Sequence, residues 1–424
     1  MMPTKIVKLR GRRVWDSRGR PTVEAEVHLA CGAVGRAIAP AGASTGSGEA
    51  LDLRDGGGQF GGLDVTQAIA NVQVPIAATL NGLDAADQAR VDAALIALDG
   101  TPQKRHLGGN AMIATSMAVA RAAAAAANQP LWQYLGGNGP MPLPQIQIFG
   151  GGAHANRRVD IQDFMVIPVG ATEYSEALDW TARVYAAAGR IMADAGNLAG
   201  VADEGGFWPN FNSNEAAVET LVRAIEKAGL TPGTDVAIAI DVAASTFGQG
   251  GIYQLGLERK RVDSDALSEM LLRWLERYPI VSVEDPMGED DGAAFARFTS
   301  AAGPKVQVVG DDLLVTNASR ISDAAAHSAC NAVLIKPNQA GTLTETKLAL
   351  DETRRVGYAP IVSARSGESE DTIIVHLAVG WGVHQLKVGA FARSERMAKW
   401  NEGLRLAEIV GGSLPPKNSF AWGR

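Results

Sequence analysis

The chain has 424 residues, of which 46% are hydrophobic and 20% charged, and its formal net charge is −7. This composition is ordinary for a globular protein of one or two domains. The acidic balance argues against a nucleic-acid-binding surface, which is normally basic. Two cysteines, Cys31 and Cys330, exclude a disulfide framework and form no metal-binding pattern, so we expect both to be small buried residues.

The sequence contains no candidate for a membrane span. The N-terminus has no apolar segment of the kind found in secretory signals. The stretch at residues 111–127 is mostly alanine and is shorter than the roughly 20 residues that a bilayer requires. We therefore expect a buried alanine-rich helix there, and a cytoplasmic protein that does not contact a membrane.

The N-terminal part is predicted to form a small α+β domain. Alternating apolar and polar residues before Pro40 predict three strands. A glycine-rich loop follows at residues 41–58, and helical spacing extends from about residue 66 to residue 129. Glycine and proline then cluster at residues 136–145, so we place this first domain at residues 1–138.

The second part, residues 139–424, alternates short apolar runs with amphipathic helical segments. Continuous apolar runs are typical of parallel strands that are buried on both faces. About 280 residues of such units fit one (β/α)8-type barrel. The main alternative topology is an open doubly wound sheet. It is weakened because no G-x-G-x-x-G stands at a first strand–helix turn. The predicted fold class is α/β, a barrel with a smaller N-terminal α+β domain.

Charged and polar residues stand at the carboxyl ends of successive apolar runs. In chain order they are Asp241, Glu284 with Asp285, Asp311 with Asp312, Lys336, Arg365 with Ser366, and Lys387. In a barrel these ends converge on one face, where active sites lie. A single acid after a strand is often only an N-cap for the next helix. Acids after three consecutive strands, followed by cations, indicate one common site, with Asp285 and Asp312 in capping or supporting roles.

Converging carboxylates repel one another unless a cation lies between them, and oxygen ligands favour Mg²⁺ over zinc. A lysine beside a bound divalent cation should have its pKa lowered by the positive charge and by desolvation, so it could act as a base near neutral pH. This combination suits removal of a proton next to a carboxylate and stabilisation of the resulting enolate. His154 lies in a glycine-rich loop near a second acid, and we expect it in the site. The other five histidines are expected at the surface or in packing.

The chain resembles the enolase (phosphopyruvate hydratase) family over essentially its whole length. The matching segments are DSRGRPTVEAEV, GASTGSGEALDLRDG, VDIQDFM, ADEGGFWPN, IDVAAS, VEDP, GDDLLVTN, LIKPNQAGTLTET, RSGESEDT and LKVGA. They are long and follow the family's order, which makes the resemblance specific. It implies an enolase-type barrel and a glycolytic lyase that removes water from 2-phosphoglycerate to give phosphoenolpyruvate. It also implies a homodimer or an assembly of dimers.

The resemblance further implies which residues bind metal and act as base. One of two Mg²⁺ ions would be bound by Asp241, Glu284 and Asp311. Ser44, in the glycine-rich loop, would close over the site and help to hold the second ion. Lys336 would take the α-proton from 2-phosphoglycerate, and Lys387 would lie beside it on the substrate carboxylate.

On the elimination side, the resemblance implies that Glu204 is the acid that assists departure of the 3-hydroxyl. Asp163 would lie on the same side of the site. The implied substrate contacts are Gln162, His154, Arg365 and Ser366, the last two at the phosphate.

The sequence departs from the family pattern at four positions near this site. Ala364 stands where the family usually has His, and Asp163 stands where it usually has Glu. Ala41 replaces the first Ser of the glycine-rich loop, and Pro337 follows the candidate base where an apolar or aromatic residue is common. Since the metal ligands and both lysines are intact, we expect enolate formation, with the changes concentrated where the hydroxyl leaves.

Two alternatives therefore stay open. The first is an enolase-like paralogue that uses 2-phosphoglycerate in phosphonate biosynthesis, in the manner of carboxyphosphonoenolpyruvate synthase. The second is a binding or scaffold protein without catalysis. The intact set of three acids argues against the second, because unpaired buried charges are costly without a metal.

Overall fold

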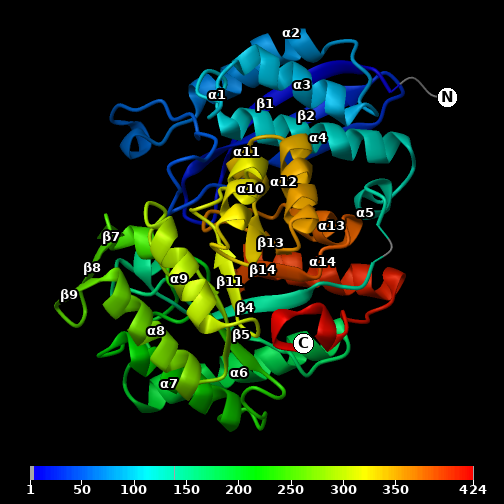
Figure 1. Cartoon of the computed structure of the whole chain (residues 1–424). Coiled ribbons are helices and arrows are strands. Elements are labelled where there is room, and N and C mark those ends of the chain that lie inside the picture. The colour runs from blue at the N-terminus through cyan, green and yellow to red at the C-terminus, as the bar shows by residue number, and fades with distance from the viewer. Residues whose placement is uncertain (1–3, 138, 424) are drawn as a thin grey trace.

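The computed structural model describes residues 4–137 and 139–423, and Figure 1 shows an N-terminal unit seated on a barrel. The N-terminal sheet is antiparallel, in the order β1-β2-β3, with strands β1 (Ile6–Trp15), β2 (Pro21–Leu29) and β3 (Val34–Ile38). Its helices are α1 (Thr66–Asn71), α2 (Ala77–Leu80), α3 (Gln88–Asp99), α4 (Gly109–Ala126) and α5 (Leu131–Tyr134). The three predicted strands and the helices after them are confirmed.

Helix α4 is the alanine-rich helix that the sequence predicts, and it is buried on nearly every side. It packs on β2 and β3 on one side and on the barrel helices α11 (Pro337–Ala340) and α12 (Leu343–Arg355) on the other. Small side chains permit this close approach. A Cβ at Gly35 of β3 would lie 2.1 Å from the carbonyl oxygen of Ala118. Among the described residues, no helix combines the length and apolarity that crossing a bilayer requires.

The second part closes into an eight-stranded barrel in the order β10-β11-β12-β13-β14-β4-β5-β6. The strands are β4 (Leu143–Gly150), β5 (Asp163–Ile167), β6 (Ala237–Asp241), β10 (Ile280–Glu284), β11 (Gln307–Gly310), β12 (Ala332–Ile335), β13 (Ala359–Ser363) and β14 (Gln385–Ala390). The six apolar runs of the sequence correspond to β6 and β10 to β14, so the predicted barrel is confirmed. Its remaining strands, β4 and β5, were not among those runs.

One strand of the barrel does not run parallel to the others. Strand β5 runs antiparallel to both neighbours, β4 and β6. Its first residue, Asp163, is therefore opposite Asp241, the last residue of β6. The reversal places the amino end of β5 on the same face as the carboxyl ends of the other strands.

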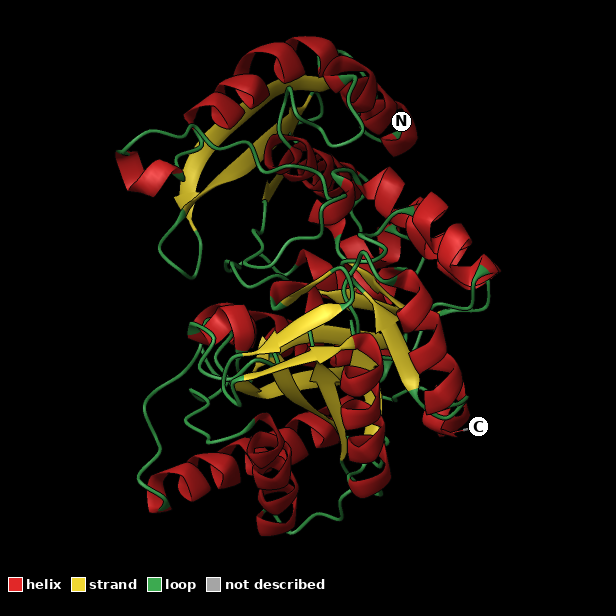
Figure 2. Cartoon of the chain, turned by 60° about the vertical axis from the view of Figure 1, so that its left-hand side comes forward, coloured by secondary structure: helices red, strands yellow, loops and turns green. Residues whose placement is uncertain are grey.

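Helices surround the barrel on the outside, as Figure 2 shows. They are α6 (Tyr174–Asp194), α7 (Asn214–Lys227), α8 (Ser264–Arg277), α9 (Gly292–Ala302), α10 (Ala318–Ala326), α12, α13 (Ile373–Gly380) and α14 (Ser394–Val410). A small antiparallel sheet of β7 (Gly248–Gln249), β8 (Ile252–Leu255) and β9 (Lys260–Asp263) precedes α8. Cys330 is buried as expected, whereas Cys31 is only partly buried because it stands in the turn after β2.

A bidentate ion pair joins the N-terminal unit to the barrel. Arg121 of α4 donates to both oxygens of Asp371, over 2.8 and 2.7 Å, and the backbone N–H of Ile38 donates to the same carboxylate over 3.0 Å. Burial acts to raise the pKa of Asp371, but the charge of Arg121 and these hydrogen bonds outweigh it, so the pKa lies below its ordinary value. The carboxylate therefore stabilises the folded state above the pKa of the unfolded chain, and this contribution is lost as the pH falls toward the folded pKa.

We predict that Asp371→Asn lowers the free energy of unfolding by about 2–3 kcal/mol at pH 7, because Arg121 loses its charged partner. The difference should shrink only below about pH 4, where the wild-type carboxyl begins to take up a proton. Urea unfolding of both proteins at pH 7 and below about pH 4 measures the difference in the free energy of unfolding. Asp323→Asn, at an exposed position of α10, is the control and should change stability by less than about 0.5 kcal/mol. Equal losses in the two variants would contradict this account of the interface.

Candidate active site

A small cavity opens where the strand ends meet, and the N-terminal glycine-rich loop covers it. It holds about 20 Å³ of free space, room for roughly one water molecule. Its lining includes Ser44, His154, Gln162, Asp163, Glu204, Asp241, Lys336, Ala364, Arg365, Ser366 and Lys387. The structure thus brings together ten of the twelve residues that the sequence analysis singles out. The other two, Glu284 and Asp311, contact the lysines of the lining.

Lys387, on β14, lies among acids from three strands. Its Nζ is 3.0 Å from Asp241 Oδ2, 2.7 Å from Glu284 Oε2 and 3.3 Å from Asp163 Oδ2. Burial acts to lower the pKa of Lys387, but the charges of Asp241 and Glu284 outweigh it and raise the pKa well above its ordinary value. Conversely, burial and the charge of Asp241 raise the pKa of Glu284, although Lys387 acts in the opposite direction.

Lys336, directly after β12, forms an ion pair with Asp311. Asp311 also accepts a hydrogen bond from Gln339 Nε2 over 2.9 Å. Burial acts to lower the pKa of Lys336, but Asp311 outweighs it, so the pKa lies above its ordinary value. The sequence analysis expected a lowered pKa for a lysine beside a bound cation. In the protein alone the direction is the reverse, because the carboxylate faces the lysine directly.

The oxygen atoms at the strand ends form a compact acidic group around Asp311. Asp285, Asp311 and Asp312 offer ligand atoms within 4.8 Å of one another, as do His154, Asp163 and Glu204. Among the described residues, only these two groups have all their ligand atoms within 4.8 Å of one another. The ligand atoms of Asp241, Glu284 and Asp311, taken together, are farther apart than that. Asp285 accepts the backbone N–H groups of Asp311 and Asp312, each over 2.8 Å, which fits the predicted supporting role. Burial and the charge of Asp311 raise the pKa of Asp312 to about 8.

The donors at the strand ends suit a hard divalent cation. Asp241, Glu284 and Asp311 are buried carboxylates on adjacent strands, and Glu284 Oε1 has no hydrogen-bond partner. A buried carboxylate oxygen without a partner is costly unless a cation or proton reaches it. Carboxylate oxygens are also the ligands that Mg²⁺ prefers. The chemistry of this set therefore fits the predicted Mg²⁺.

A second group in the same cavity, called here the acid side, has His154 between two carboxylates. Its Nδ1 is 3.2 Å from Asp163 Oδ1, and its Nε2 is 3.7 Å from Glu204 Oε1. Burial acts to lower the pKa of His154, but the charges of Glu204 and Asp163 outweigh it and raise the pKa. Burial likewise opposes ionisation of Asp163, yet the charges of Lys387 and His154 hold its pKa far below its usual range. Both neighbouring carboxylates therefore favour the protonated form of the imidazole.

Arg365 is held by residues that sequence reasoning did not single out. Its Nη1 donates to Glu49 Oε2 over 2.8 Å and to Asn338 Oδ1 over 3.0 Å. Its Nη2 donates to the carbonyl oxygen of Ser44 over 3.1 Å, which ties the guanidinium to the glycine-rich loop. Glu49 lies within that loop, and its Oε1 accepts the backbone N–H of Gly46 over 3.0 Å. The sequence could have pointed to Glu49 and Asn338, since both lie in segments that match the family.

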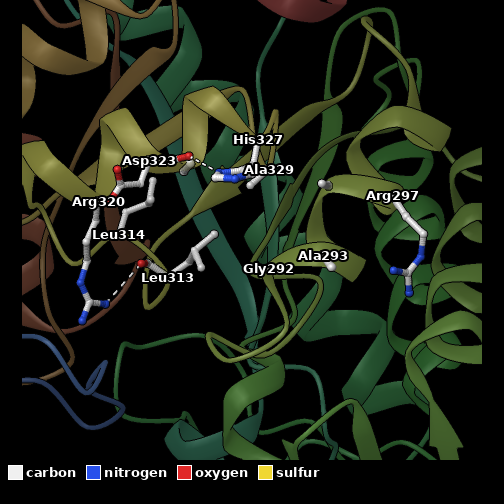
Figure 3. Close-up of a pocket in the computed structure, with 11 residues that line it drawn as sticks. Gly292, Ala293, Arg297, Leu313, Leu314, Arg320, Asp323, His327 and Ala329 are labelled. Carbon is white, nitrogen blue, oxygen red and sulfur yellow. Dashed lines mark hydrogen bonds between the residues drawn. The ribbon is translucent and has the colours of Figure 1, made fainter.

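A second cavity lies on the outside of the barrel, between α9 and α10 (Figure 3). It measures about 740 Å³, and alanines and Leu313 make up much of its wall. Arg320 and Arg297 lie toward its opposite ends. It shares no lining residue with the strand-end cavity. The converging acids and lysines, rather than cavity size, therefore identify the candidate active site.

The fold and the site together define an α/β-barrel protein with acids and lysines gathered at its strand ends. The sequence matches "Enolase, N-terminal domain" over residues 6–135 and "Enolase, C-terminal TIM barrel domain" over residues 139–416. It is also 48% identical over 424 residues to "Enolase 1" of Desulfitobacterium hafniense (strain Y51), covering 98% of this chain and 97% of that protein. The chain belongs to the enolase family, and the predicted family and fold class are confirmed.

We predict that Glu49→Gln loosens the glycine-rich loop, because an amide donor then faces the guanidinium of Arg365. A loss of about 2 kcal/mol in local stability corresponds to roughly 30-fold faster amide hydrogen exchange. Exchange of the peptide containing residues 42–48, followed by mass spectrometry, measures the effect. Glu345→Gln, whose carboxylate pairs with Lys104 instead, is the control. Unchanged loop exchange in Glu49→Gln would show that the ion pair does not hold the loop.

Proposed function

We propose that this protein is a Mg²⁺-dependent lyase that converts 2-phosphoglycerate into phosphoenolpyruvate and water. The observation that carries the proposal is the division of one cavity into two sides. Lys336 and Lys387 lie with the carboxylates of β6, β10 and β11 on one side. Glu204 and His154 lie on the other. Removal of water across two carbons needs a base and an acid in this arrangement.

The lysine side suits proton removal. Lys336 takes the α-proton at Nζ, and the electron pair of the C–H bond moves into an enolate of the substrate carboxylate. The ammonium of Lys387 binds that carboxylate and stabilises its added charge. When bound, Mg²⁺ would be held by Asp241, Glu284 and Asp311 and would supply positive charge at the enolate oxygens. A cation on Asp311 would also compete with Lys336 for that carboxylate, which would lower the pKa of the lysine.

The acid side completes the elimination. The substrate carboxylate is re-formed from the enolate, and the electron pair forms a new double bond between C2 and C3 as the bond from C3 to its hydroxyl breaks. Glu204 gives a proton to the departing oxygen, so that water leaves. His154, between Glu204 and Asp163, orients the acid, and Gln162 contacts the substrate. The product is phosphoenolpyruvate.

The phosphate end is assigned to Arg365 and Ser366. A guanidinium offers paired donors that match phosphate oxygens. Ser366 Oγ already accepts the backbone N–H of Ala43 over 3.0 Å, so this hydroxyl also meets the glycine-rich loop. The small free volume of the cavity means that the loop must move to admit a phosphorylated three-carbon acid. Its return would exclude water from the enolate, and Ser44 would help to hold a second Mg²⁺.

Several wider properties belong to the same proposal. Residues 1–138 would form the capping domain and residues 139–424 the catalytic domain. The protein would act in glycolysis in the cytoplasm, as a homodimer or an assembly of dimers. Its substrate is a small phosphorylated hydroxy acid, and the acidic net charge of −7 gives no support to a nucleic-acid partner.

The phosphonate-pathway paralogue is not favoured. The relative that matches nearly the full length carries the name enolase, which supports dehydration of 2-phosphoglycerate. Ala364 lines the cavity without an imidazole, but Asp163 keeps its contact with His154. A scaffold protein without catalysis would have no use for this buried cluster of acids and lysines.

We predict that the purified protein forms phosphoenolpyruvate from 2-phosphoglycerate with Mg²⁺, measured by ultraviolet absorbance. Lys336→Ala should lower kcat by roughly 10²–10⁴-fold, because it removes the base. Lys347→Ala, on the outer surface of α12, should leave kcat unchanged. Absence of product from the wild type, with product from Ala364→His, would instead favour the phosphonate-pathway alternative.

A further inference from the structure

Gln147 is an uncharged residue that contacts both Asp163 and His154 on the acid side. It lies on β4 and is completely buried. Its Nε2 donates to Asp163 Oδ1 and lies 3.5 Å from His154 Nδ1. Its Oε1 accepts the backbone N–H of Gly206 over 2.9 Å. One carboxamide therefore connects the start of β5 to the loop that carries Glu204.

The loop after Glu204 is shaped to receive this carboxamide. A Cβ at Gly206 would lie 2.4 Å from Gln147 Oε1, closer than real Cβ contacts, so only glycine admits the hydrogen bond. Gly205 has a φ of +94°, a conformation that side chains other than glycine rarely adopt. Both glycines that follow the candidate acid thus serve to bring the backbone against β4 and β14. The Gln147 carboxamide is thus one of the groups that hold the loop of Glu204, together with the backbone N–H of Ala390, which donates to the carbonyl oxygen of Glu204 over 2.9 Å.

The length of the Gln147 side chain matches the short carboxylate that it contacts. Asp163 has one methylene fewer than the Glu usual in the family, so its oxygens stay close to β5. Shortening Gln147 to Asn would withdraw the carboxamide by one carbon–carbon bond, about 1.5 Å. That displacement takes it out of hydrogen-bond range of Asp163 and Gly206 together. Lengthening Asp163 to Glu would close the gap again.

We infer that Gln147 is a positioning residue for the elimination step, holding Asp163 and the Glu204 loop in place on either side of His154. The inference rests on the proposed function, because it concerns departure of the hydroxyl. Gln147 makes no hydrogen bond to Lys336 or Lys387 among the bonds of the described residues. Gln147 reaches the lysines only indirectly, through Asp163 and Lys387. Proton removal by Lys336 should therefore be much less sensitive to Gln147 than loss of the hydroxyl is.

The test uses Gln147→Asn, Asp163→Glu and the double variant. Loss of a residue that orients a functional group typically costs about 10–100-fold. We expect kcat to fall by this amount in Gln147→Asn while KM for 2-phosphoglycerate changes less than about threefold. Asp163→Glu should also lose activity, because the longer carboxylate crowds the full-length amide. The double variant should recover the part of the loss that comes from the contact with residue 163, because the summed length of that pair is restored, while the hydrogen bond to Gly206 stays lost.

The matched control is Gln145→Asn, the same chemical change two residues earlier on the same strand. Gln145 is also buried, but it donates to Gln385 over 2.8 Å, away from the acid side. Its kcat should stay within about threefold of the wild type. Thermal unfolding of each variant shows whether it is folded. If Gln147→Asn alone does not fold, comparing kcat of Asp163→Glu with kcat of the double variant still tests the inference. A higher kcat in the double variant supports it, and an equal or lower kcat contradicts it.

A second measurement separates the two chemical steps. Exchange of the C2 proton of 2-phosphoglycerate with D₂O, followed by NMR, reports removal of the α-proton without requiring product. In Gln147→Asn this exchange should remain within about threefold of the wild type while formation of phosphoenolpyruvate falls. Equal losses in exchange and elimination, equal losses in Gln145→Asn, or no recovery in the double variant would overturn the inference. A wild type that forms no product would instead refute the proposed function.

Discussion

The site depends on buried negative charges that are brought together by the closure of the barrel. Strand pairing places Glu284 beside Asp241 and beside Val309, two residues before Asp311, so neighbouring strands deliver their acids to one face. In the interior each repulsion is stronger than it would be in water. Two lysines from later strands offset part of it, and both have raised pKa values. The lysines thus offset part of the repulsion in the folded protein. Glu284 Oε1 still has no hydrogen-bond partner, so this oxygen is free to bind a cation.

The reversed direction of strand β5 brings Asp163 into the cavity that also contains Lys387. In a barrel with all strands parallel, Asp163 at the beginning of a strand would lie on the opposite face. Because β5 runs antiparallel, Asp163 comes opposite Asp241 and within 3.3 Å of Lys387 Nζ. One residue therefore touches both halves of the site. Although burial opposes it, the charge of Lys387 keeps the pKa of Asp163 low, and the charges of Glu204 and Asp163 raise the pKa of His154.

Much of this arrangement follows from the sequence, for a physical reason. Continuous apolar runs predict strands, and the residue after each strand must face the carboxyl end, so Asp241, Glu284 and Lys336 could be placed by position alone. The direction of β5 could not, because a short apolar run has no signal for its orientation. The connection from β4 to β5, residues 151–162, contains only the short 3-10 helix at Gly152–Ala155 and no α-helix of the kind that usually joins parallel strands.

The residues that sequence reasoning missed act through other side chains. Gln147 belongs to an apolar-looking strand, and its importance appears only when Asp163 and Gly206 are placed beside it. Glu49 stands in a glycine-rich loop, and its partner Arg365 is 316 residues away in the chain. Two residues that pair over such a distance in the chain leave no pattern in the nearby sequence from which the contact could be predicted. The lowered pKa expected of a lysine beside a bound cation stays a prediction, since it depends on a cation that changes which charges face the lysine.

The central claim is that the acids at the strand ends form a Mg²⁺ site, and calorimetric titration of the metal-free protein with Mg²⁺ tests it most directly. The wild type should bind Mg²⁺ saturably, and at about 100 times Kd the protein should gain about 2.7 kcal/mol of stability. Glu284→Gln should weaken this binding by about tenfold or more, since it removes a charged ligand. Absence of binding in the wild type, or equal affinity in Glu284→Gln, would contradict the account.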